Sequence, residues 1–155
     1  GGSDEGVDKT VLLDQLVSAV AAIATMSSSG PVAARIASTS GLTQGLMMAL
    51  RSDSEPVQLY AAGAMGNLAN HTASLAVVTA ARGLARAVVR LTRQGKSAAV
   101  VETAAGAVRN LAACQRGREE LAKEPTAIQS LVALVSEQDS EGRETNLQAQ
   151  LKAAG

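Results

Sequence analysis

Apolar residues recur along this chain at the three- and four-residue spacing of amphipathic helices. The first such pattern covers residues 8–27, where polar Gln15 interrupts an otherwise apolar face. A face with this spacing predicts a helix, and the run from Ser27 to Pro31 contains the serines, glycine and proline that end one. The apolar positions of this first predicted helix are Val11, Leu12, Leu16, Ala19, Val20 and Ile23.

The same pattern predicts further helices, separated by glycine, proline or short polar runs. A short helix begins at Pro31, and others open at Gly41, Gly83 and Thr126. Two long helices are predicted over 56–70 and 98–114, and two short ones over 73–81 and 116–123. The polar runs 53–56, 94–97 and 138–142 predict three equivalent loops. After the third loop, the residues expected to cover the last complete layer are Leu147, Leu151 and Ala154.

Two separate parts of the sequence repeat with the same period. The segment AAGAMGNLAN at 61–70 matches AAGAVRNLAA at 104–113, which lies 43 residues later. The helix-opening residues Gly41, Gly83 and Thr126 are 42 and 43 residues apart, and apolar pairs follow each at the same offset. A period in the forties is typical of a helical solenoid. We therefore predict an all-α fold of about three to four stacked repeats, truncated at the C-terminal end because the Ala-Ala-Gly at 153–155 falls inside a repeat.

The three-helix unit resembles the armadillo repeat family, whose second helix opens on glycine and whose third reads A-A-x-A-L-x-N-L-A. That motif stands at 61–69 and at 104–112. The resemblance implies a right-handed α-solenoid, an armadillo-type superhelix, over residues 8–155. Within it, 8–27 would be the last helix of a partial repeat, 31–70 and 73–114 two repeats, and 117–155 an incomplete one. Residues 1–7 are expected to be a flexible N-terminal segment or the remnant of an expression tag.

Two asparagines are the most informative polar residues. Asn67 shares a helix face with Gly63 and Tyr60, and Asn110 shares the equivalent face with Gly106 and Thr103. The resemblance implies that this face lines a groove where each amide could bind the backbone of an extended peptide, since an amide carries both donors and an acceptor. The alternative is that each amide ties neighbouring helices together. By this alignment Ala22 takes the asparagine position of the first repeat.

The neighbours of the asparagines leave alternatives open. Gly63 and Gly106 occupy positions where nuclear-import receptors of the same fold carry tryptophan, so recognition of a basic localisation signal is not expected. Close helix packing is the simpler explanation of these glycines. The alternative, which implies a binding site, is that they leave room for a bulky group of a partner. Tyr60, the one aromatic residue, could be an anchor for a partner, or its ring could pack at the edge of the solenoid. Arg109 lies beside Asn110 on the candidate groove.

Composition and charge exclude several functions. Lys and Arg balance Asp and Glu at 14 each, so no excess of basic charge favours nucleic-acid binding. The longest apolar run is shorter than the roughly 20 residues of a membrane span. No catalytic constellation, metal site or cofactor motif emerges, since Cys114 and His71 are single residues of their type. A basic stripe, either a solvated face or a site for an acidic partner, comprises Arg82, Arg86, Arg90 and Arg93.

These observations predict a non-enzymatic scaffold for protein–protein interaction that binds an extended peptide or partner protein along the groove. The alternative is a structural subunit of a larger cytoskeletal, ciliary or organelle assembly, which docks through convex or end surfaces. Neither function involves a small-molecule substrate, nucleic acid or membrane span, and self-association through the truncated end is a further expectation. We expect an intracellular location, cytoplasmic in the first place, with nuclear or organelle-associated locations as alternatives.

Overall fold

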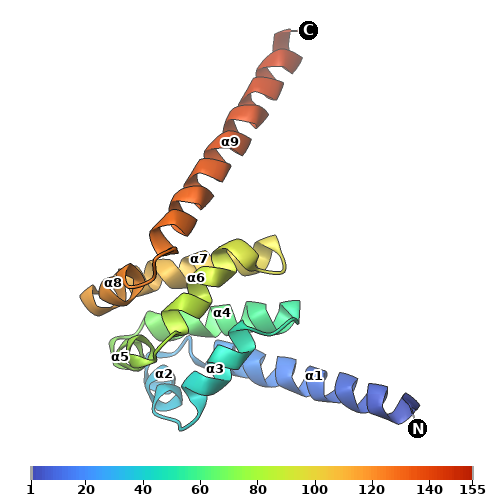
Figure 1. Ribbon diagram of the computed structural model, residues 1–155, viewed down its shortest axis with the longest axis vertical. Helices are drawn as coiled ribbons and strands as arrows, with labels where there is room; N and C mark the ends of the chain where they lie inside the picture. Colours follow the sequence, from blue (N-terminus) through green and yellow to red (C-terminus); the bar gives the residue numbers. More distant parts are fainter. Residues whose placement is uncertain (1, 155) are drawn as a thin grey trace.

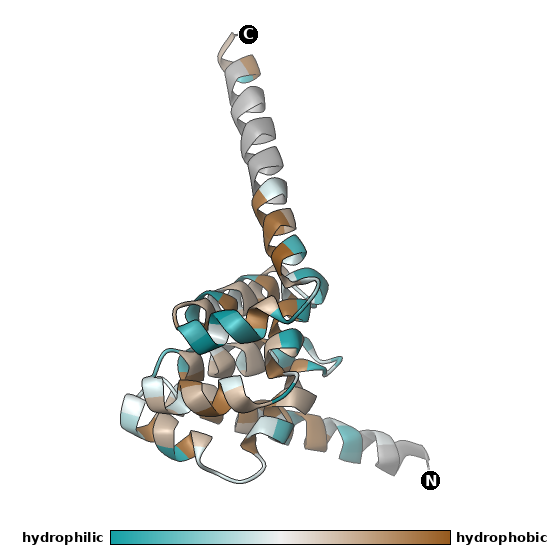
Figure 2. Ribbon diagram, turned by 60° about the vertical axis from the view of Figure 1, so that its left-hand side comes forward, coloured by the Kyte–Doolittle hydropathy of each residue, from teal (hydrophilic) through white to brown (hydrophobic). Residues whose placement is uncertain are grey.

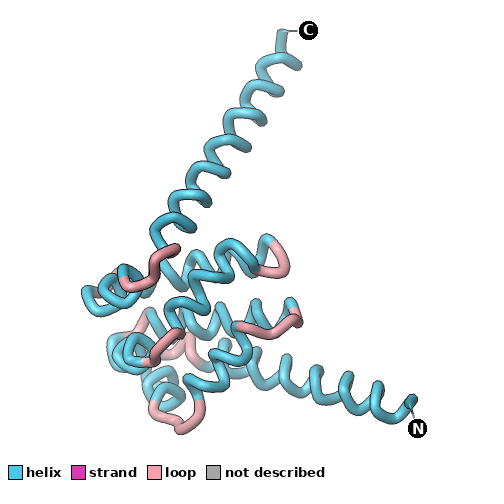
Figure 3. The backbone as a smooth tube through the Cα atoms, viewed as in Figure 1, coloured by secondary structure: helices cyan, strands magenta, loops and turns pink. Residues whose placement is uncertain are grey.

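The computed structural model describes the backbone of residues 2–154 and the side chains of residues 6, 8–136 and 151–154. All regular elements in this part of the chain are helices joined by short loops (Figure 3). The prediction of an all-α fold is therefore confirmed. The helices are α1 (Gly2–Met26), α2 (Gly30–Ala37), α3 (Leu42–Leu50), α4 (Glu55–Ala69), α5 (Thr72–Ala80), α6 (Leu84–Gln94), α7 (Ala98–Ala112), α8 (Gln115–Ala122) and α9 (Ala127–Ala154).

Each helix packs against the helix three places further along the chain. The long helices α1, α4 and α7 lie side by side, and so do the short helices α2, α5 and α8. In the same way α3 packs on α6, and α6 packs on the beginning of α9 (Figure 1). The helices thus form three rows, in which each helix is stacked on the equivalent helix of the previous group of three. This arrangement follows the 43-residue spacing in the sequence.

The core between these ranks consists of aliphatic side chains and alanine. The fully buried large residues include Leu50, Met65, Leu84 and Leu111. Between them lie alanines of α4 with no exposed surface, such as Ala61 and Ala64. Because alanine adds only a methyl group to the helix surface, α4 can approach α1 and α7 closely without a large aromatic filler.

Glycines open α3 and α6 as the repeat predicts. Gly41 and Gly83 each cap their helix with φ near +85° and +84°, in the left-handed region. A side chain is disfavoured in that conformation because its Cβ crowds the backbone. The two glycines therefore let the chain reverse sharply between the short first helix and the second helix of each repeat.

The prediction of a loop at 138–142 is wrong, because α9 continues through these residues to Ala154. As a result, no separate long helix within residues 2–154 folds back over α7, and α9 projects from the stack (Figure 1). Leu151, which was expected to cover the last layer, is 66% exposed, and Ala154 is also exposed. Leu147, assigned to the same layer, lies outside the residues whose side chains are described. At the other end of the chain, α1 begins at Gly2 rather than at residue 8.

One stretch of α1, Asp8–Met26, is long and apolar enough to cross a membrane by length and composition. No membrane span was predicted from the sequence because the unbroken apolar run in this helix is shorter than about 20 residues. α5 and α6 would qualify only together, across a bend of 89°. A single helix of this kind near the N-terminus is weak support for a membrane span, because packed helices and signal sequences share its composition. In this structure α1 packs against α4.

Candidate functional site

The two asparagines tie the long helices together. Asn67 of α4 donates its Nδ2–H to the carbonyl oxygen of Ala24 in α1, at 2.8 Å. Asn110 of α7 makes the same bond to Gly66 in α4, at 2.9 Å. The alternative reading of these amides as ties between neighbouring helices is thus what the structure shows. Each bond uses one amide hydrogen, and the side-chain oxygen has no partner among the described residues, so it is available to a ligand.

The helix ends correct the alignment of the first repeat. α1 ends at Met26, α4 at Ala69 and α7 at Ala112, so the equivalent positions are 43 residues apart. The position equivalent to Asn67 is therefore Ala24 rather than Ala22. The first repeat still lacks the asparagine, and Ala24 contributes its carbonyl oxygen to the tie instead.

The glycines beside the asparagines are not there for close packing. A Cβ added at Gly106 would meet nothing within 4 Å, and one at Gly63 would meet only the Thr103 methyl at 3.9 Å. The simpler explanation of these two residues is therefore wrong. Of these glycines, Gly66 lies nearest to the neighbouring long helix, since a Cβ there would make an ordinary contact with Ala107 of α7 at 3.6 Å.

The other residues predicted for the groove lie on the same two helices. Tyr60, at the beginning of this face, is 39% exposed. The Thr103 hydroxyl donates to its own helix at Ala99 O, 2.7 Å away, and its methyl faces Gly63. The Arg109 side chain is exposed. We call the surface made by Tyr60, Gly63 and Asn67 of α4 together with Thr103, Gly106 and Asn110 of α7 the long-helix face.

His71 and Cys114 occupy equivalent positions and both serve the fold. His71 precedes α5, and its Nε2 lies 3.3 Å from the carbonyl oxygen of Ser28 in the loop between α1 and α2. Its ring also packs on Gly30, where a Cβ would come within 3.2 Å of Nδ1. Cys114 caps α8 and accepts a hydrogen bond from the Gly117 N–H. Within the described residues there is no group of three or more potential metal ligands.

Sequence reasoning missed Gln58, a buried amide that joins two loops. Its Nε2–H donates to Ser52 O at 2.8 Å, and its Oε1 accepts from the Lys96 N–H at 3.1 Å. Nearby, the Ser97 hydroxyl donates to the Glu55 carboxylate at 2.9 Å. Gln58 precedes the repeated Ala-Ala-Gly, and the next repeat has Val101 at the equivalent position. The repeat pattern itself therefore gave no signal for this contact.

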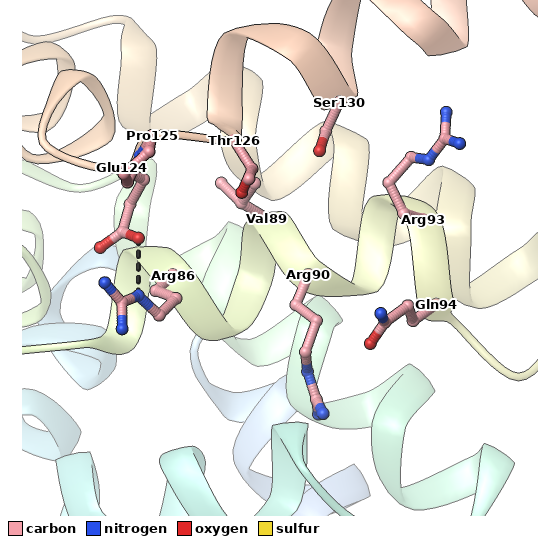
Figure 4. Close-up of a pocket in the computed structure, with 9 residues that line it drawn as sticks. All are labelled: Arg86, Val89, Arg90, Arg93, Gln94, Glu124, Pro125, Thr126 and Ser130. Atoms are coloured by element: carbon pink, nitrogen blue, oxygen red, sulfur yellow. Dashed lines mark hydrogen bonds and ion pairs between the residues drawn. The ribbon is translucent and has the colours of Figure 1, made fainter.

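The predicted basic stripe is partly used inside the protein. Arg86 forms an ion pair with Glu124 at 2.7 Å, and Arg90 donates to Leu50 O at 3.4 Å. Arg82 precedes α6 and so does not continue the stripe along that helix. Arg86, Arg90 and Arg93 line an open groove of about 560 Å³ whose other side is formed by residues 124–126 and Ser130 (Figure 4). Binding of an acidic partner there stays a prediction.

No family model matches this chain, and comparisons with curated proteins and with solved structures gave no match either. The resemblance to the armadillo family therefore rests on the sequence motifs alone. The arrangement of the helices, and the environment of each predicted residue, are the observations on which a function can be argued.

Proposed function

We propose that this chain is a right-handed α-solenoid of the armadillo type and acts as a non-enzymatic scaffold for protein–protein interaction. It binds an extended peptide or partner protein along the long-helix face. The stacking of α1, α4 and α7, with equivalent residues every 43 positions, supports the solenoid because each repeat then rests on its neighbours.

The open space at Gly106 carries the proposal. A glycine inside a helix lowers its stability by about 1 kcal/mol relative to alanine. At Gly106 nothing within the fold occupies the space that a side chain would take. No helix of the described residues covers this part of α7, so an incoming backbone or bulky side chain finds room at the glycine. Asn110 lies one turn further along the same face and can offer its side-chain oxygen to a peptide N–H.

Peptide selection with a blocking variant tests the proposal. Random peptides are displayed on phage and selected against the wild-type chain, and their affinity is measured by fluorescence polarisation. Gly106→Leu fills the open space with a side chain that also favours the helix. We expect it to weaken binding by about tenfold or more, equivalent to about 1.4 kcal/mol.

The matched control is Ala76→Leu, which places the same side chain at an exposed position of α5. This variant is expected to bind as the wild type does, and circular dichroism shows whether both variants keep their helices. Equal affinity of wild type and Gly106→Leu for every selected peptide would contradict binding at the long-helix face.

A second candidate function is the structural subunit that docks through its ends. The observation that favours it is the exposed apolar surface at both ends of the stack. Leu12 of α1 is 62% exposed, and Ile128 of α9 is 66% exposed. For this candidate, substitutions on the long-helix face leave assembly unchanged, whereas substitutions on α1 or α9 abolish it.

A further inference from the structure

An apolar groove of about 390 Å³ lies between α1 and α3 at one end of the stack. All of its lining side chains are uncharged. Figure 2 shows the apolar residues of α1 where it joins the stack. The residues that matter for the argument are Leu16, Ala19 and Ile23 of α1 and Leu42 and Leu46 of α3.

The interior of the protein shows what such a groove normally holds. Ala19 is exposed, whereas Ala62, its equivalent in α4, has no exposed surface. Leu42 is half-buried, whereas Leu84, its equivalent in α6, is fully buried. In the interior, α3 packs against both α4 and α6. The groove between α1 and α3 is therefore the equivalent site, and within the described residues no helix takes the place there that α3 takes between α4 and α6.

A helix of the required kind lies uncovered at the opposite end. α9 packs on α6 as α6 packs on α3. Its residues Ile128, Val132 and Val135 lie on one face and are 66%, 57% and 66% exposed. The equivalents of Val132 and Val135 in α6 are Val89 and Thr92, which are only 2% and 1% exposed.

The contrast has a direct cause. α6 is followed by the long helix α7, which packs against it. α9 instead continues without a break to Ala154, so no separate long helix follows it within the described residues. We call Ile128, Val132 and Val135 the α9 stripe. In Figure 2 the beginning of α9, just above the stack, carries hydrophobic colouring.

We propose that a second copy of this chain fills the groove, with the α9 stripe of one copy docked between α1 and α3 of the next. α8 and the first part of α9 from one copy then combine with α1 of the other copy. Together they complete one three-helix repeat with the contacts that α5, α6 and α7 make within the chain. The inference does not depend on the proposed binding at the long-helix face.

The lengths of the two helices are consistent with this pairing. α1 has 25 residues against 15 in α4 and in α7, and α9 has 28 against 11 in α6. Because the two surfaces differ, the interface is heterologous and builds open chains of copies, or a ring if the rotation closes.

Light scattering after size-exclusion chromatography, over a range of protein concentrations, tests the proposal. The wild type is expected to form oligomers larger than a dimer, with a mass that rises with concentration. Val132→Arg places a charge in the α9 stripe, and Ala19→Arg places one in the groove. Both positions are exposed in the single chain, so the fold tolerates them, and each variant should have the mass of one chain.

Mixing the two variants gives the sharpest result. Val132→Arg keeps an intact groove and Ala19→Arg keeps an intact stripe, so the mixture should form a dimer of one copy of each and stop there. The control Met48→Arg charges an apolar side chain of α3 that is 75% exposed and does not line the groove. It should assemble as the wild type does.

Two results would overturn the proposal. One is a wild type that stays monomeric at every concentration, which would assign the groove to a helix of another protein or to a further segment of the same one. The other is a mixture of the two variants that remains monomeric although the wild type assembles, because the contact would then not join stripe to groove.

Discussion

Asn110 in α7 donates a hydrogen bond of 2.9 Å to the carbonyl oxygen of Gly66 in α4, a residue 44 positions earlier. Asn67 makes the equivalent bond to Ala24 in α1 at 2.8 Å. Gly66 and Ala24 lie in the last turn of their helices, where the backbone N–H four residues further on bonds to a different carbonyl. The asparagine amide therefore supplies a donor that the helix backbone does not. The asparagine therefore fixes how one long helix lies against the previous one. It sets the register of the face on which we propose that a partner binds.

Removal of the Asn67 tie should lower stability moderately. Asn67→Ala loses one hydrogen bond in a half-buried position, which corresponds to about 1 kcal/mol. For a chain of this length, about 1 kcal/mol lowers the Tm by roughly 2–4 °C. Asn67→Asp should be worse, because it replaces a donor by a carboxylate that faces the Ala24 carbonyl oxygen. Thermal unfolding followed by circular dichroism measures both.

Asn70→Ala is the control, since Asn70 is exposed at the end of α4, and its Tm should stay close to that of the wild type. If Asn67→Asp is as stable as the wild type, the tie has no energetic importance. The expected loss also makes aspartate a poor choice for testing partner binding at this position, which is why Gly106→Leu is preferred.

Gly106→Ala should stabilise the protein. The new methyl meets no atom of the fold within 4 Å, and alanine favours the helix by about 0.5–1 kcal/mol over glycine. Urea unfolding should give a higher midpoint with an unchanged slope. A lower midpoint would show that the fold requires the glycine, and the argument for an external ligand at this position would fail.

Gly117→Ala should destabilise the protein strongly. A Cβ at this position of α8 would collide with the backbone carbonyl of Leu111. At the equivalent position of α5, Ser74 has room to donate its hydroxyl to Leu68 O at 2.6 Å. Crowding of this kind costs about 1–3 kcal/mol, and urea unfolding measures it.

The matched control for this crowding is Gly45→Ala in α3, where a Cβ meets nothing within 4 Å. That variant should be at least as stable as the wild type. Equal stability of Gly117→Ala and Gly45→Ala would mean that α8 does not lie as close to α7 as the structure places it.

Gln58→Ala should loosen the contact between successive loops. The variant removes two partly buried hydrogen bonds, to Ser52 O and from the Lys96 N–H, which together correspond to about 1–3 kcal/mol. Hydrogen exchange should then be faster at the Lys96 amide. Gln44→Ala is the control, because Gln44 is exposed on α3. An unchanged exchange rate at Lys96 in Gln58→Ala would contradict the bond.

Much of the helix order could be predicted because the stop signals are local. Pro56 lies in the first turn of α4, and Gly41 and Gly83 adopt the left-handed backbone that opens α3 and α6. The run 138–142 has no proline, and several of its neighbours, such as Glu137 and Arg143, are good helix formers. Its polar character resembled the earlier loops, but nothing in it obliges the helix to end.

The candidate site could be predicted only in part. Shared helix faces placed Asn67 beside Gly63 and Asn110 beside Gly106, since helical spacing fixes which residues are neighbours. Whether a glycine is close to another helix depends on the distance between α4 and α7, which the motif does not contain. In the structure the contact with α7 lies at Gly66 instead of at Gly63. Gln58 was missed because its partners lie in two loops, and no repeated pattern marks them.

The most direct test of the central claim is a nuclear magnetic resonance titration of the ¹⁵N-labelled chain with a selected peptide. Binding at the long-helix face predicts that the side-chain amide signals of Asn67 and Asn110 shift, together with the backbone amides of Gly63 and Gly106. Signals of exposed residues on α5, such as Ala76, should stay in place. Shifts confined to α6 and α9, with both asparagine amides unchanged, would contradict the claim.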